Sequence, residues 1–191
     1  MAKLQNYVEI ESRDKEGHLL DSRGFPSESY VIAFLDILKV QMQQVSQANV
    51  TDTGGTLRTV TITTPPLNMA AAVSVIDRGT RVGTGVAAVT LTDNKLGTKI
   101  AEGVAATQMH HEPQEFTTPA TVGSTRSFTT TRVMLNDSAG GASITLNECG
   151  IYGRDTTNSF TYRLARDLVS PGIVVANLGT ITIRYTIGVT V

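Results

Sequence analysis

The stretch that decides the fold runs from Thr180 to Val191 and reads TITIRYTIGVTV. Apolar residues fill every odd position of this stretch, and Thr, Arg or Gly fills every even position. A period of two predicts a β-strand with one face on a core, because successive side chains of a strand point to opposite faces. The residues that we expect to face the core are Ile181, Ile183, Tyr185, Ile187 and Val189.

Further strands are predicted upstream, separated by turns rich in Gly, Asn and Asp. The ranges expected as strands are 57–64, 86–92, 124–135, 143–152 and 159–167, with turns at 136–141 and 153–158 and a break at Ser170-Pro171-Gly172. Residues 69–76 are a short apolar run that fits a buried strand or a helical turn. Antiparallel strands at a spacing of about ten residues are typical of sandwiches and barrels. The sequence therefore predicts a mainly β fold, an antiparallel β-sandwich or open barrel, over residues 49–191.

One N-terminal amphipathic helix is predicted over residues 27–48. Its apolar positions recur at steps of three and four, which places them on one stripe of a helix; they are Tyr30, Val31, Phe34, Leu35, Leu38, Met42 and Val45. Ser27 or Ser29 could cap its start. Such a helix either packs on the sheet or lines a subunit contact.

Residues 1–26 are predicted to form an N-terminal arm or a hairpin. The segment is polar, and its apolar anchors look too few for a core of its own; they are Tyr7, Val8, Ile10, Leu19, Leu20 and Phe25. An arm would order against a neighbouring subunit, as in strand addition to a sheet edge. A hairpin would fold back on its own domain. Under the arm hypothesis the candidate interface residues are Tyr7, Val8, Ile10 and Phe25.

The composition favours a neutral β protein. Of the 191 residues, 28 are Thr, 17% are charged and the net charge is −1. Nucleic-acid binders carry a clustered positive excess, so this balance argues against that class. The sequence contains no run of eighteen apolar residues, so it predicts no membrane-spanning helix. The N-terminus lacks the apolar centre of a signal peptide. A single Cys is typical of a protein that folds in a reducing cytoplasm.

Three motifs could carry chemistry, and each has a simpler interpretation. Gly79, Gly83 and Gly85 suggest a phosphate loop, but no Lys follows and the next residues are apolar, so we expect a turn or bulge. His110, His111 and Glu112 could bind a metal only by subunit symmetry, because neighbouring side chains of a strand point apart; an exposed loop is the simpler expectation. Cys149 has no base signature nearby and is expected to be a buried, structural thiol.

Charged residues inside predicted strands form the second set of candidate interface residues. These are Glu148, Arg163, Arg166 and Asp167. They could pair across strands or across a subunit boundary. Such pairs set register or partner choice more often than they add stability. We favour that role over catalysis, and the sequence indicates no enzyme and no cofactor.

The segment Ser143–Tyr152, which reads SITLNECGIY, resembles the N-E-apolar-G-[LI]-Y strand of structural proteins of tailed bacteriophages. The resemblance extends to YRLARDL at 162–168, to Gly179 with the terminal strand, and to VGTG at 82–85 with Leu96 and Ile100. It also includes Ser29-Tyr30-Val31 and Phe34-Leu35 before Gln41-Met42. Cys149 departs from the usual aliphatic residue of the motif.

This resemblance implies a virion protein, either a capsid decoration or head-associated protein or a neck or tail accessory protein. It would be made in the host cytoplasm, and its partners would be copies of itself and other virion proteins, with no nucleic acid, membrane or small-molecule substrate. The alternative is a receptor- or carbohydrate-binding β-sandwich of a tail tip. Binding modules of that kind usually expose aromatic rings, whereas only 5% of this chain is aromatic and Trp is absent.

Overall fold

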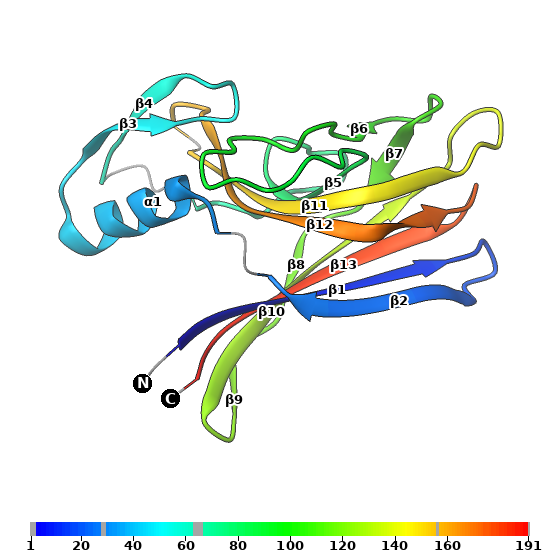
Figure 1. Ribbon diagram of the computed structural model, residues 1–191, viewed down its shortest axis with the longest axis horizontal. Coiled ribbons are helices and arrows are strands. Elements are labelled where there is room, and N and C mark those ends of the chain that lie inside the picture. Colours follow the sequence, from blue (N-terminus) through cyan, green and yellow to red (C-terminus); the bar gives the residue numbers. More distant parts are fainter. Residues whose placement is uncertain (1–2, 28–29, 63–66, 156, 191) are drawn as a thin grey trace.

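The computed structural model describes residues 3–27, 30–62, 67–155 and 157–190, and the protein is mainly β, with several sheets and one short helix (Figure 1). In chain order the elements are β1 (Lys3–Arg13), β2 (Leu19–Pro26), α1 (Ile32–Gln43), β3 (Gln47–Thr51), β4 (Leu57–Val60), β5 (Gly79–Gly83), β6 (Ala101–Glu102), β7 (Gln108–His111), β8 (Glu115–Phe116), β9 (Ala120–Val122), β10 (Thr125–Leu135), β11 (Ile144–Arg154), β12 (Thr161–Val175) and β13 (Thr180–Thr190).

The large sheet is built around β13. Its order is β2-β1-β13-β10-β7-β6, with β8 and β9 also paired to β10. Along its whole length β13 is antiparallel to β1 on one side and to β10 on the other. The alternating C-terminal segment is therefore a central strand, as its period predicts.

A small sheet, in the order β12-β11-β5, lies over one face of the large sheet (Figure 1). Side chains connect the two layers. The Tyr185 hydroxyl donates to Asp167 Oδ2 at 3.0 Å and to Cys149 Sγ at 3.1 Å, and Arg132 Nη1 donates to the carbonyl of Thr80 at 3.2 Å. The face of the large sheet that carries Tyr185 is called the inner face below.

The inner face is buried at one end and uncovered at the other. Ile181, Ile183 and Tyr185 have no exposed surface, so these three core predictions are confirmed. Ile187 is only partly buried, and Val189 is 43% exposed. The prediction that Val189 faces the core is therefore wrong. The strand keeps its period, but the large sheet continues past the end of the small sheet (Figure 1).

Residues 3–26 form a hairpin that folds back on its own chain. Strand β1 pairs with β13 from Lys3↔Thr190 to Arg13↔Thr180, and β2 pairs with β1. Val8 and Ile10 are completely buried in the common core, and Phe25 packs against it. The expectation that these anchors need a neighbouring subunit is wrong, because β13 and the small sheet supply the other walls. Tyr7 points to the opposite face and is 41% exposed.

The helix is shorter than the predicted range 27–48. Helix α1 ends at Gln43, its C-cap Gln44 adopts the left-handed conformation, and β3 begins at Gln47. The predicted apolar stripe is wrong at Leu35 and Val45, which are 61% and 56% exposed, because Ile37 and Val40 face the core instead. Ser27 does not cap the helix, since its hydroxyl donates to Asp167. Ser29 and the side chain of Met42 lie outside the described residues. Within the described ranges, no helix has the length and apolar character needed to cross a membrane.

Several predicted boundaries are also corrected. Residues 86–92 are irregular rather than a strand, and 69–76 form neither a strand nor a helix. Strand β4 ends at Val60, and 63–66 lie outside the described residues. Strand β12 continues through the expected break at 170–172 by means of an irregular register opposite β11. Residues 79–83 form the buried strand β5 rather than a turn.

Asp in place of Ile183 should destabilise the protein by about 3 kcal/mol or more, because an unpaired carboxylate would enter a fully buried position. Val189→Asp, on the same face of the same strand, should cost less than about 1 kcal/mol, because its carboxylate can reach water. Urea denaturation of dilute protein measures both changes. Equal losses would show that the inner face is covered along its whole length.

Candidate functional site

The outer face of the small sheet carries a layer of charged side chains beneath an irregular segment, residues 84–100, which we call the cover loop. Glu148 from β11 and Arg163 and Arg166 from β12 are almost completely buried there. Register explains why they share this face: Gly150 lies opposite Arg166, and Tyr152 lies opposite Arg163. The charged layer thus occupies the place where a second apolar core would otherwise be.

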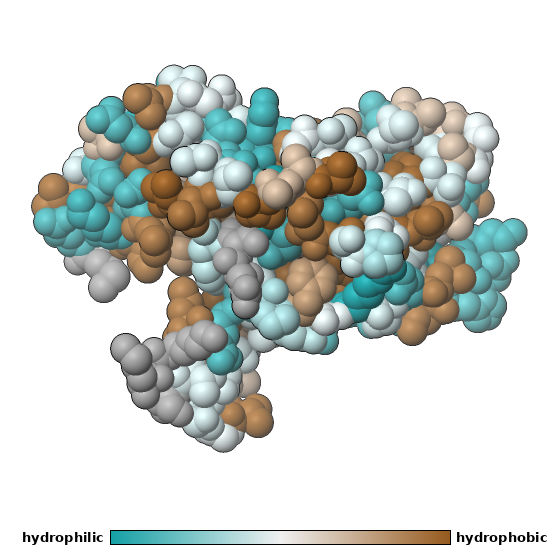
Figure 2. All heavy atoms as spheres, viewed as in Figure 1, coloured by the Kyte–Doolittle hydropathy of each residue, from teal (hydrophilic) through white to brown (hydrophobic). Residues whose placement is uncertain are grey.

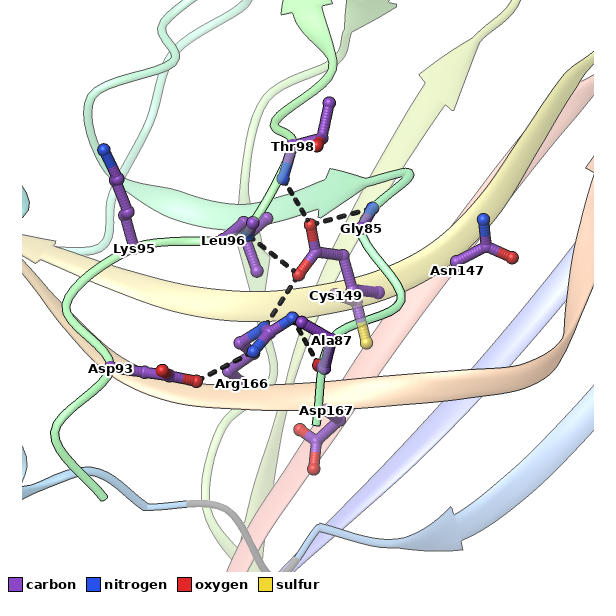
Figure 3. Close-up of polar contacts among 12 residues, drawn as sticks. Gly85, Ala87, Asp93, Lys95, Leu96, Thr98, Asn147, Cys149, Arg166 and Asp167 are labelled. Carbon is purple, nitrogen blue, oxygen red and sulfur yellow. Dashed lines mark hydrogen bonds and ion pairs between the residues drawn. The ribbon is translucent and has the colours of Figure 1, made fainter. Parts of the chain in front are cut away.

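The Glu148 carboxylate accepts hydrogen bonds from the cover loop and from the neighbouring strand. Oε1 accepts the N–H groups of Thr98 at 2.9 Å and Gly85 at 3.1 Å. Oε2 accepts the N–H of Gly97 at 3.1 Å and Arg166 Nε at 2.7 Å. Figure 3 shows Gly85, Thr98 and Arg166 converging on this point. A single buried anion therefore ties both ends of the cover loop to β11.

The glycines near Glu148 are required by this close approach. A Cβ atom on either Gly83 or Gly85 would lie 2.5 Å from Glu148 Oε1. No side chain fits at that distance, so only glycine lets the backbone amides reach the carboxylate. The spacing that suggested a phosphate loop does serve an anion, but the anion is a carboxylate of the same chain.

Two arginines and Asp93 complete the layer. Arg166 Nη1 is 2.8 Å from Asp93 Oδ2, and its Nη2 donates to the carbonyl of Ala87 at 2.9 Å (Figure 3). Arg163 lies 3.6 Å from Asp93 and donates to the carbonyls of Lys95 and Asp93. Burial alone would raise the pKa of Asp93, but hydrogen bonds from Thr90 and Arg166 and the charge of Arg163 outweigh it and lower that pKa. The arginines therefore fix the middle of the cover loop.

The motif at 147–152 works as a set of anchors for the cover loop. Asn147 Nδ2 donates to the carbonyl of Thr84 at 3.0 Å, and the Tyr152 hydroxyl accepts the N–H of Leu96 at 2.6 Å. A Cβ on Gly150 would lie 3.2 Å from Leu96 Cδ2 and 2.6 Å from the carbonyl oxygen of Ala165. Asn147, Glu148, Gly150 and Tyr152 thus all hold one connection in place.

The predicted charged residues come together only in part. Glu148, Arg163 and Arg166 meet across strands inside the chain, whereas Asp167 lies on the other face of the small sheet, toward the inner face, and accepts hydrogen bonds from Ser27 and Tyr185. The other predicted interface residues do not join this charged group, because they lie on β1 and β2 of the large sheet; they are Tyr7, Val8, Ile10 and Phe25. Sequence reasoning missed Asp93 and the carbonyls of the cover loop, because irregular backbone offers no periodic signal. The glycine spacing did mark the right segment.

Cys149 lies on the face of the small sheet that packs against the inner face, where burial and the nearby charge of Asp167 raise the pKa of its thiol well above the ordinary range. The thiol accepts a hydrogen bond from the Tyr185 hydroxyl. A protonated thiol is a poor nucleophile at neutral pH. The geometry therefore fits a packing role for Cys149.

The histidine pair is not an exposed loop, which corrects that expectation. His110 and His111 end β7, and their Nδ1 atoms lie 2.8 Å and 2.9 Å from the two oxygens of Glu102. His111 has no exposed surface, and within the described part of the chain its Nε2 has no hydrogen-bond partner. Burial, followed by the charges of Arg81 and Arg132, lowers the pKa of His111 to about 4. This imidazole is therefore neutral at physiological pH.

An apolar hollow separates the start of α1 from the uncovered end of the large sheet. Its volume is about 380 Å³, and its walls include Tyr30 and Phe34 on one side and Phe128 and Ile187 on the other. The rings of Tyr30 and Phe34 stack with centroids 4.4 Å apart. Figure 2 shows the hollow between the body and the projecting end of the large sheet. This hollow is the candidate contact surface of the protein.

Comparisons with protein-family models, with curated proteins and with solved structures found no match.

Glu148→Gln should destabilise the protein by about 3 kcal/mol or more, since it removes one charge of a buried pair and turns an amide donor toward backbone N–H groups. The cover loop of the variant should also be cleaved at a protease concentration that leaves the wild-type loop intact. Glu9→Gln, at an exposed position of β1, is the matched control and should leave both properties unchanged. A stable, protease-resistant E148Q protein would contradict the anchoring role of the carboxylate.

Stability should fall in acid partly because of His111. Its pKa drops from 6.5 to about 4 on folding, so between those values the unfolded chain binds a proton that the folded chain does not. This contribution is absent above pH 6.5, grows as the pH falls and levels off below pH 4, at roughly 3 kcal/mol of destabilisation. Urea denaturation at pH 7 and pH 4.5 should show a smaller loss for His111→Gln than for the wild type. An equal loss for His111→Gln and for the wild type would contradict this role of His111.

Proposed function

We propose that the protein is a structural subunit of a tailed phage particle, which self-associates and docks on the capsid or tail in a decoration or neck or tail accessory role. In this proposal the two stacked sheets are an open antiparallel β-sandwich, and α1 turns an amphipathic face to it. The observation that carries the proposal is the uncovered end of the inner face. At this end, Leu4 and Val189 continue the alternation of the buried core residues but are exposed to solvent.

The uncovered surface consists of two rows that cross β1, β13 and β10. In one row Asn6 and Phe128 flank Ile187, and in the next row Leu4 and Arg126 flank Val189. Leu4 is 45% and Val189 43% exposed, although residues four and six positions further along the same face are completely buried. We call these two rows, together with the apolar hollow beside them, the uncovered inner face.

The opposite face of the same strands is polar. Thr125 and Thr190 share a hydrogen bond of 2.7 Å between their hydroxyls, and Thr129 and Thr186 share one of 2.8 Å. Threonine ladders of this kind suit a face in contact with water. The projecting end of the sheet therefore has a polar side that suits contact with water and an inner side on which the apolar Leu4 and Val189 are exposed.

Exposed apolar side chains such as Leu4 and Val189 beside an apolar hollow are typical of a contact site rather than of a free monomer surface. A neighbouring subunit that inserts its own projecting end would cover both copies by the same contacts, which is how symmetric oligomers bury self-complementary patches. The resemblance of residues 143–152 to phage structural proteins supports a virion as the setting. In this fold the motif anchors a loop and carries no catalytic group, which suits a structural role.

A carbohydrate-binding role is less well supported by the hollow. Sugars are bound by aromatic faces together with several polar groups that fix the hydroxyls. Of the eleven residues that line the hollow, only Asn68 and Tyr30 carry a polar side-chain group, an amide and a phenol. Apolar groups of a protein partner fit these walls better.

The double variant Leu4→Glu with Val189→Glu should dissociate the oligomer, because it places charges on the uncovered inner face. The control is Gln5→Glu with Ser127→Glu, which puts the same charges on the polar face of β1 and β10 and should leave association intact. Sedimentation velocity at micromolar concentration measures both. A monomeric wild type, or equal dissociation of the two variants, would overturn the assembly role. The virion setting requires in addition that the protein co-purify with phage particles.

A further inference from the structure

A second pocket opens at the margin of the charged layer, away from the apolar hollow. Its volume is about 420 Å³. It is lined by Thr53, Ile76, Asp77, Arg81, Lys99, Ala101, Tyr152 and Thr161. We call it the basic pocket, because Arg81 and Lys99 both face it and neither has a carboxylate partner within ion-pairing distance among the described residues.

Arg81 is held in place without being neutralised. Only 2% of its surface is exposed. Its guanidinium donates to the carbonyls of Ile76 and Ile100, and its Nε has no hydrogen-bond partner among the described residues. Buried arginines usually bind a carboxylate, as Arg166 does with Glu148 and Asp93 in the adjacent layer. Arg81 therefore carries a charge at the wall of the pocket that forms no direct ion pair among the described residues, although Glu102 acts on it from a longer distance.

Lys99 adds a second charge of the same sign. Its ammonium lies 5.9 Å from the ring centroid of Tyr152, another wall of the pocket. Partial burial, followed by repulsion from Arg81 and Lys95, lowers the pKa of Lys99. The one carboxylate of the lining, Asp77, is already paired with Arg78 and Arg154. The local charge is thus positive in a chain whose net charge is −1.

We propose that the basic pocket binds a small organic anion through a phosphate or carboxylate group held between Arg81 and Lys99. The hydroxyls of Thr53 and Thr161 line the same space and can donate to its oxygens. Ile76 and Ala101 offer apolar contact for a carbon skeleton, and the volume suits a ligand larger than a bare ion. This site is separate from the uncovered inner face, so it does not depend on the proposed assembly role.

The test is isothermal titration of the full chain with pyrophosphate and with citrate, which present the two anionic groups. Lys99→Gln should weaken binding of the better probe by about tenfold or more, as the loss of a charge-assisted contact predicts. Lys95→Gln removes the same charge nearby but outside the lining of the pocket, and it should weaken binding by less than about threefold.

Amide chemical shifts locate the site independently of affinity. On titration they should move at Lys99, Ala101 and Thr161, and unchanged spectra of the free variants would show that both remain folded. The proposal is overturned if neither pyrophosphate nor citrate binds at millimolar concentration. Equal weakening in both variants, or shifts spread over the surface, would also overturn it, because either result indicates unspecific attraction to positive charge.

Discussion

The Glu148 carboxylate holds the cover loop on the outer face of the small sheet. One buried anion accepts three backbone N–H groups of the cover loop and the guanidinium of Arg166. The cover loop has no regular secondary structure of its own over most of its length, so these contacts replace the backbone ladder that would otherwise satisfy its amides. Positions 83 and 85 require glycine, because the Glu148 carboxylate lies too close to both backbones to leave room for a side chain. The small sheet is consequently buried on both faces, by apolar residues below and by a charged layer above.

The unequal lengths of the two sheets create the uncovered inner face. Strand β13 keeps its alternation to the end, but among the described residues Val189 is exposed and Ile187 only partly buried, whereas Ile183 is completely buried. In a free monomer this would leave the side chains of Leu4 and Val189 in water beside an apolar hollow. The proposed contact between subunits explains why the pattern continues past the point where the chain can bury it.

The charged layer and the basic pocket are two outcomes of the same architecture. Where a carboxylate is present, as with Glu148 and Asp93, the buried arginines are neutralised and the cover loop is fixed. Where none is present, as with Arg81 and Lys99, the charge remains available at the wall of a pocket. The contrast within one layer is the reason for assigning structure to the first group and anion binding to the second.

Much of the β architecture could be predicted from the sequence, because period and turn chemistry are local properties. The strands 180–190, 125–135 and 144–154 follow directly from alternation and from the Gly and Asn turns, and so does the burial of Ile181, Ile183 and Tyr185. Tertiary structure alone decided that residues 3–13 pair with β13, that Ile37 rather than Leu35 faces the core, and that Val189 is exposed. It also decided the partners of Glu148, since the cover loop, some fifty residues away along the chain, has no period from which its position could be inferred. Long-range pairing depends on which surfaces meet, and a single strand or loop does not encode that by itself.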